Sequence, residues 1–178
     1  MKIAQFLLRF TVGVLLGIGL GRVHAQDASL QGVKGVHAWT GWVSWVADGD
    51  TLLVLPEQAH EPVKLRIEGI DAPERCQPGG DASRDAMIEL VHRKTVQVFP
   101  HGADTYGRVL GRVEIDGRDV AAEMVASGMA WAYRFRETSG PYAALERQAR
   151  KQKKGLFAEP QPMTPRVFRQ FHGSCHGP

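Results

Sequence analysis

Alternating apolar and polar positions dominate the chain from residue 37 to residue 70, and this period-two pattern predicts β-strands with one buried face. It is clearest at Val63, Leu65 and Ile67, which are separated by Lys64 and Arg66. The expected strands span residues 37–47, 51–56 and 62–70. We therefore predict a three-stranded meander whose first turn contains residues 48–50.

Helical periodicity appears after residue 80 and alternates with further short strands. Asp81 is a candidate N-cap for a helix to about residue 94, Asp119 caps a second helix through Ser127, and Gly128 ends it. The remaining elements are expected as strands at 95–99, 108–115 and 130–135 and a third helix at 142–154. This order predicts an α+β, predominantly β fold, in which a five-stranded barrel carries three packed helices.

Three tryptophans in the first strand, Trp39, Trp42 and Trp45, cannot share one face of a regular strand. We expect some of them in the core and one on the surface, where it could stack on a nucleic-acid base.

The first 25 residues are typical of a secretory signal. Lys2 and Arg9 precede an apolar stretch, and the small residues around Ala25 offer a cleavage site before Gln26. An uncleaved membrane anchor is the alternative, but Arg9 shortens the apolar run. We predict cleavage, a secreted or periplasmic protein and no stable membrane association.

Cleavage would change the charge balance. The signal segment holds three of the 22 basic residues and none of the 19 acidic ones, so the mature chain is neutral overall. Residues 134–178 nevertheless hold 9 basic and 3 acidic residues. This part of the chain is a candidate face for a polyanion, although a solvated Lys- and Arg-rich helix explains 147–154 equally well.

Two cysteines, Cys76 and Cys175, are the only ones in the chain. An exported protein permits a disulfide between them, while free thiols or an intermolecular bridge are the alternatives. We favour the bridge, which would place the C-terminal tail close to Glu74. His172 and His176 flank Cys175, but a disordered Gly-rich tail is a better interpretation than a metal site.

Carboxylates and arginines cluster in three short runs. Asp48-Gly49-Asp50-Thr51 follows the first strand, Arg66 to Glu74 follows the third, and Asp104 to Arg108 precedes the strand at 108–115. Carboxylate oxygens suit a hard divalent cation, and arginines bind anionic oxygens. Each run alone could be an ordinary turn. Together they indicate metal-assisted cleavage of a phosphodiester.

The order and spacing of these runs resemble the staphylococcal nuclease (thermonuclease) family over residues 37–160. The matching runs also include 120–133 and the Lys-Lys-Gly-Leu-Phe segment at 153–157. The resemblance implies an OB-fold barrel and a Ca²⁺-dependent phosphodiesterase. With the signal peptide predicted above (1–25), the resemblance places the nuclease domain at 37–160, between a flexible segment (26–36) and a C-terminal tail (161–178).

The resemblance also implies a role for each site residue. Asp50 and Asp71 would bind Ca²⁺ together with the backbone carbonyl of Ala72. Asp48 would not bind the ion itself but would organise the turn or a bound water. Glu74 would act as general base, while Arg66 and Arg108 would stabilise the phosphate in the transition state. The substrate-binding candidates are Tyr106, Tyr133 and Arg134. Arg134 stands, by the nearest alignment, where the family's best-known member has a tyrosine that packs against the substrate base.

Three functions are compatible with these sequence features. The leading one is an exported, monomeric nuclease acting on single-stranded or frayed DNA and RNA. A non-catalytic OB-fold nucleic-acid-binding protein is the alternative. Binding a different ligand, such as an oligosaccharide, is the third. A carboxylate cluster is needed only for the first.

Overall fold

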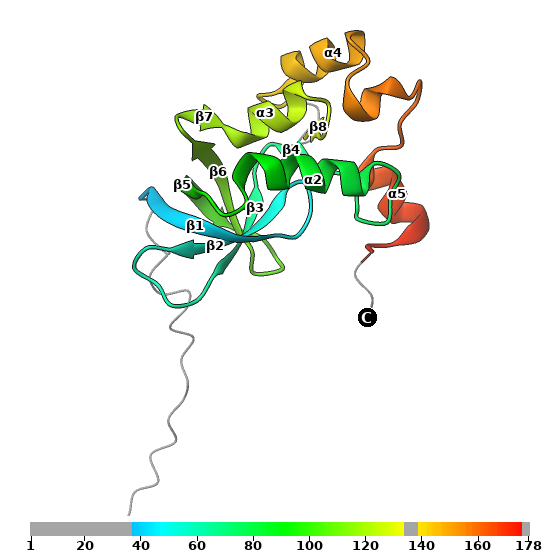
Figure 1. Ribbon diagram of the computed structural model, residues 1–178. Coiled ribbons are helices and arrows are strands. Elements are labelled where there is room, and N and C mark those ends of the chain that lie inside the picture. Colours follow the sequence, from blue (N-terminus) through cyan, green and yellow to red (C-terminus); the bar gives the residue numbers. More distant parts are fainter. Residues whose placement is uncertain (1–36, 134–138, 176–178) are drawn as a thin grey trace, which may run out of the picture.

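The computed structural model describes residues 37–133 and 139–175 and contains a small β-barrel with helices packed against it (Figure 1). The predicted signal peptide, the segment at 26–36 and Arg134 lie outside the described residues. The elements are β1 (Trp39–Val46), β2 (Thr51–Pro56), β3 (Val63–Ile67), β4 (Ile70–Asp71), α2 (Gly80–Val91), β5 (Thr95–Ala103), β6 (Val109–Ile115), β7 (Arg118–Asp119), α3 (Val120–Ala126), β8 (Trp131–Ala132), α4 (Ala143–Lys151), η1 (Gly155–Ala158) and α5 (Pro165–His172).

Five strands close the barrel. The sheet order is β3-β2-β1-β5-β6-β7, and β3 also pairs with β6, which joins the two sides. That closing pair is parallel and aligns Leu65 with Val109, whereas the pairs β1–β2, β2–β3, β1–β5 and β5–β6 are antiparallel. The predicted α+β, OB-type barrel is therefore confirmed.

The barrel core comes from the alternation seen in the sequence. Val63, Leu65 and Ile67 of β3 are buried, while Lys64 is exposed and Arg66 is half-buried on the other face of the strand. Met87 and Val91 of α2 complete the same core. The outer face of β3 is thus free to present charged side chains.

A β-bulge in β1 determines which of the three tryptophans are exposed. The register with β2 shifts between Val43 and Trp45, so Trp42 and Trp45 are both about half exposed, whereas Trp39 packs against the core. The expectation of a single exposed tryptophan was wrong, because the inserted residue turns two of them outward.

Several element boundaries differ from the predictions, and two differences lie close to the site. Gly79 is the N-cap of α2, so Asp81 lies within the first turn instead of capping it. The tail after Pro160, for which no helix was predicted, forms α5, making four α-helices among the described residues where three were expected. The side chain of Thr164 caps α5, and Pro165 occupies its first turn.

No described helix has the length and apolar character needed to cross a bilayer.

Candidate active site

The turn between β1 and β2 places two carboxylates at one end of the barrel. Asp48 Oδ1 accepts a hydrogen bond from the backbone N–H of Asp50 at 3.0 Å, which stabilises the turn. A Cβ on Gly49 would lie 2.0 Å from Ser83 Oγ of α2, so only glycine fits at the centre of this turn. Helix α2 therefore packs directly beneath the two carboxylates.

Asp50 is buried and connects the turn to β4. Its Oδ1 accepts a hydrogen bond from Thr51 Oγ1 at 3.0 Å, and its Oδ2 accepts one from the N–H of Ala72 at 2.7 Å. Both carboxylate oxygens are thereby held in place before any ligand binds.

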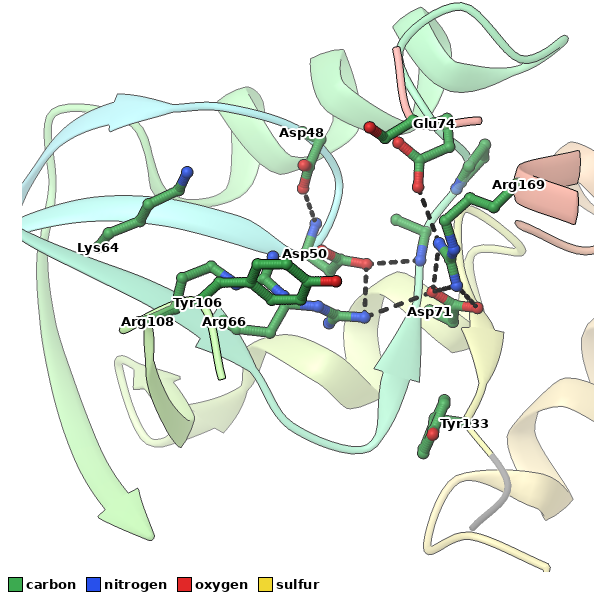
Figure 2. Close-up of a pocket in the computed structure, with 13 residues that line it drawn as sticks. Asp48, Asp50, Lys64, Arg66, Asp71, Glu74, Tyr106, Arg108, Tyr133 and Arg169 are labelled. Atoms are coloured by element: carbon green, nitrogen blue, oxygen red, sulfur yellow. Dashed lines mark hydrogen bonds and ion pairs between the residues drawn. The ribbon is translucent and has the colours of Figure 1, made fainter. Parts of the chain in front are cut away.

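Arg66 links the two candidate metal-binding carboxylates (Figure 2). Its Nη2 lies 3.0 Å from Asp50 Oδ2 and 3.4 Å from Asp71 Oδ1, while Nη1 donates to the carbonyl of Ile67 at 2.8 Å. The carboxylates of Asp50 and Asp71 thus converge on one positive group.

The segment after β4 positions Glu74. The N–H of Glu74 donates to Gln77 Oε1 at 3.2 Å, and a Cβ on Gly80 would lie 2.1 Å from the carbonyl oxygen of Glu74. The start of α2 therefore packs tightly against this residue. The carboxylate of Glu74 faces the same pocket as Asp50 and Asp71.

Burial and mutual repulsion disfavour the charged forms of two carboxylates in this cluster. Desolvation, followed by the charge of Asp50, raises the pKa of Asp48 to about 7. The pKa of Asp71 is also raised, by burial and then by Asp50, although Arg169 and Arg66 oppose this shift. Closely spaced carboxylates with raised pKa values favour binding of a positive charge.

The donor set fits a hard divalent cation. Within residues 37–133 and 139–175, no three His, Cys, Asp or Glu side chains are arranged to hold a metal by themselves. Asp50 and Asp71 could supply two carboxylates to a shared cation, and Ala72 lies beside them in the pocket. Backbone, water and substrate oxygens would have to supply the remaining ligands, which hard cations accept.

The β5–β6 hairpin supplies the second predicted arginine. Asp104 Oδ1 accepts hydrogen bonds from the N–H groups of Tyr106 and Arg108, and Arg108 Nε donates to Asp104 Oδ2 at 2.7 Å. Although partial burial acts the other way, these hydrogen bonds lower the pKa of Asp104. Arg108 is thereby fixed at the start of β6, next to β3 and Arg66.

The predicted site residues within the described ranges line one open pocket of about 530 Å³. They are Asp48, Asp50, Arg66, Asp71, Ala72, Glu74, Tyr106, Arg108 and Tyr133. Tyr106 and Tyr133 are exposed, at 83% and 45% respectively, so their rings are accessible to a ligand.

The predicted disulfide between Cys76 and Cys175 is present, with the two Cα atoms 5.6 Å apart. A feature not predicted from the sequence is that α5, which leads to Cys175, brings Arg169 into the pocket. Arg169 Nη1 donates to Glu74 Oε1 at 2.8 Å, and Nη2 lies 3.2 Å from Asp71 Oδ2. The Thr-Pro sequence at the start of α5, close in sequence to Cys175, is the signal from which a helix beside the pocket could have been predicted.

Comparison with known proteins gives consistent matches. The family model for staphylococcal nuclease homologues matches residues 64–159. A protein of Escherichia coli named "uncharacterized endonuclease" is 41% identical over 130 residues, covering 72% of this chain and 84% of that protein. A micrococcal nuclease of Shigella flexneri is 33% identical over 165 residues, covering 85% and 94% respectively. An "uncharacterized endonuclease" of Haemophilus influenzae is 34% identical over 125 residues, covering 70% of each chain.

Proposed function

The chain belongs to the staphylococcal nuclease family, and we propose that it is an exported, Ca²⁺-dependent enzyme that hydrolyses DNA and RNA with little sequence specificity. The family match and the named relatives support nuclease activity itself. The ion, the preference for single-stranded or frayed substrate and the export are the parts that we propose.

One observation carries the proposal, namely that Asp50, Asp71 and Glu74 face two arginines, Arg66 and Arg108, across a single pocket. A protein that only binds nucleic acid needs basic and aromatic groups but gains nothing from buried carboxylates, which repel phosphate. The acidic cluster therefore favours catalysis over the non-catalytic alternative.

Asp50, Asp71 and the carbonyl of Ala72 would hold the cation. Staphylococcal nucleases are metal-dependent, and a bound Ca²⁺ would neutralise charge that develops on the phosphate. Asp48 would keep the turn in place through its hydrogen bond to the N–H of Asp50.

Glu74 would accept the proton of the attacking water. Its side chain reaches into the pocket from the segment between β4 and α2, which packs tightly against Gly80, and it is itself mostly buried, which suits a general base. Arg66 and Arg108 would bind the non-bridging phosphate oxygens and stabilise the additional charge of the five-coordinate transition state. Tyr106 and Tyr133 would contact the sugar or base, because both rings are exposed at the rim of the pocket.

Export is supported by two features of the chain. The N-terminal 25 residues have the pattern of a signal peptide. The Cys76–Cys175 bridge suits an oxidising compartment, since disulfides are rare in the reducing cytosol.

The test is release of acid-soluble nucleotides from heat-denatured DNA by protein beginning at Gln26. Release is expected with Ca²⁺, should stop with chelator and should fall by orders of magnitude in Glu74→Gln. The control is Glu61→Gln, which removes an equivalent charge from an exposed loop. Wild-type protein that binds DNA in a gel shift but releases nothing would support the non-catalytic alternative instead.

A further inference from the structure

Helix α5 contributes Arg169 to a site whose proposed metal-binding and catalytic residues all lie between the β1–β2 turn and the start of β6. Arg169 Nη1 donates to Glu74 Oε1 at 2.8 Å, while Nη1 and Nη2 lie 3.2–3.4 Å from the two carboxylate oxygens of Asp71. Figure 2 shows Arg169 lying between Glu74 and Asp71. One guanidinium therefore contacts both the proposed general base and a proposed metal ligand.

The helix is fixed to the active site at both of its ends. Before α5, the carbonyl of Met163 accepts a hydrogen bond from Gln77 Nε2 at 2.6 Å. After it, Cys175 is bonded to Cys76. Between them, Phe168 is buried. Cys76 and Gln77 follow Glu74 almost directly, so the tether keeps Arg169 close to its carboxylate partners at a high effective concentration.

Contacts between Arg169 and Asp71 engage the oxygens that a cation would need. Asp71 Oδ1 is already within 3.4 Å of Arg66, and Arg169 approaches both Oδ1 and Oδ2. Charge-assisted pairs of this kind are stronger than neutral hydrogen bonds. A cation binding to Asp71 must therefore displace the guanidinium of Arg169 or share the carboxylate with it.

We propose that Arg169 is a positioning residue that holds Asp71 and Glu74 in the metal-free enzyme and competes with the divalent cation for Asp71, with the disulfide keeping it in place. The proposal rests on the metal site of the proposed function. It assigns the C-terminal segment a role in setting metal affinity, in addition to any stabilising role.

The test measures Ca²⁺ binding directly, by isothermal titration calorimetry of the protein beginning at Gln26. Replacing Arg169 by Gln is expected to lower the Kd for Ca²⁺ about tenfold, because the competitor is removed while a polar side chain remains. Arg166→Gln is the matched control, since it removes the same charge from an exposed position of α5. It is expected to change the Kd by less than about twofold.

Measuring the Kd for Ca²⁺ at high salt distinguishes direct competition for Asp71 from long-range repulsion between Arg169 and the cation. At 0.5 M KCl, charges beyond roughly 5 Å are largely screened, but a guanidinium in contact with the ligand oxygens still has to be displaced. The difference between Arg169→Gln and wild type should therefore persist at high salt. An unchanged or higher Kd in Arg169→Gln, or a difference that salt abolishes, would overturn the proposal.

The tether is tested by combining variants. Opening the disulfide with Cys76→Ser and Cys175→Ser should lower the Kd when Arg169 is present and have little effect in the Arg169→Gln background. Equal effects in both backgrounds would show that the bridge acts independently of Arg169 and would remove the tether from the proposal.

Failure of this inference can be distinguished from failure of the proposed function. Ca²⁺-dependent nuclease activity with an unchanged Kd in Arg169→Gln leaves the function intact and rejects the role of Arg169. Tighter Ca²⁺ binding in that variant, combined with no DNA hydrolysis by the wild-type protein, supports the role of Arg169 and rejects the nuclease assignment. Absence of Ca²⁺ binding in every variant rejects both.

Discussion

The backbone N–H of Ala72 donates a hydrogen bond to Asp50 Oδ2 at 2.7 Å, and this buried bond joins two turns that lie 22 residues apart. Asp50 therefore shapes the site in addition to supplying charge. Replacing it by Ala should destabilise the protein by about 1–3 kcal/mol, because buried donors lose their acceptor. Asp50→Asn keeps an acceptor oxygen, so it should retain most of the stability while still losing Ca²⁺ affinity.

Urea unfolding and calorimetric Ca²⁺ titration of the two Asp50 variants would check this division. If both variants unfold at the same urea concentration, the hydrogen bond between Ala72 and Asp50 does not stabilise the turns as described.

Arg108 should affect catalysis far more than folding, since its ion pair with Asp104 is partly exposed to solvent. Its side chain lines the pocket beside Arg66, so Arg108→Ala is expected to lower the rate by roughly 10²–10³. Initial rates on denatured DNA, together with a thermal melt, would measure this. Arg112→Ala is a suitable control, because Arg112 stacks on Phe99 and pairs with Glu114 on the same strand. Equal rates in the two variants would contradict the assignment of Arg108.

The hydrogen bonds that Asp104 accepts predict a pH dependence of stability. Its pKa is lower in the folded protein than the ordinary value of 3.8. The resulting stabilisation is therefore fully present above pH 3.8 and is lost as the pH falls through the lower, folded-state pKa. The free energy of unfolding of Asp104→Asn should lie below that of wild type at pH 7, and the difference should shrink in acid.

Denaturant unfolding between pH 2 and pH 7 would reveal this behaviour. Asp85→Asn, which changes an exposed carboxylate of α2, should show no such convergence. A difference between wild type and Asp104→Asn that is constant with pH would contradict the prediction.

Reduction of the disulfide should lower the melting temperature. The bridge closes a loop with a sequence separation of 99, for which the chain-entropy model gives about 4–5 kcal/mol. Thermal melts with and without reductant, alongside thiol titration of the unreduced protein, would test this. Two titratable thiols before reduction, with an unchanged melt, would show that the bridge does not form in solution.

Much of the fold can be read from the sequence because local patterns determine it. The alternation at Val63, Leu65 and Ile67 specifies which face of β3 is buried, and Asp119 caps α3 as predicted, accepting a hydrogen bond from the N–H of Ala122. The bulge at Val43–Trp45 is a feature of the pairing of β1 with β2. It leaves no comparable signal in the sequence.

In the same way, some site residues can be predicted from short motifs, whereas one is placed only by tertiary folding. The motif runs identify Asp50, Asp71, Glu74, Arg66 and Arg108, and the fold brings all five to one pocket. Arg169 could not be found in this way, because it lies 95 residues from Glu74 and reaches it only through the folding of α5 and the bridge to Cys76.

The parallel pairing of β3 with β6 determines when a functional site can exist. Arg66 lies on β3 and Arg108 immediately precedes β6, and these strands become neighbours only when the barrel closes with Leu65 opposite Val109. A chain in which β3 and β6 have not yet paired therefore has its two arginines apart and lacks the assembled pocket. Assembly of the pocket thus depends on one long-range strand pairing, so a partly folded chain with an open barrel is expected to be inactive.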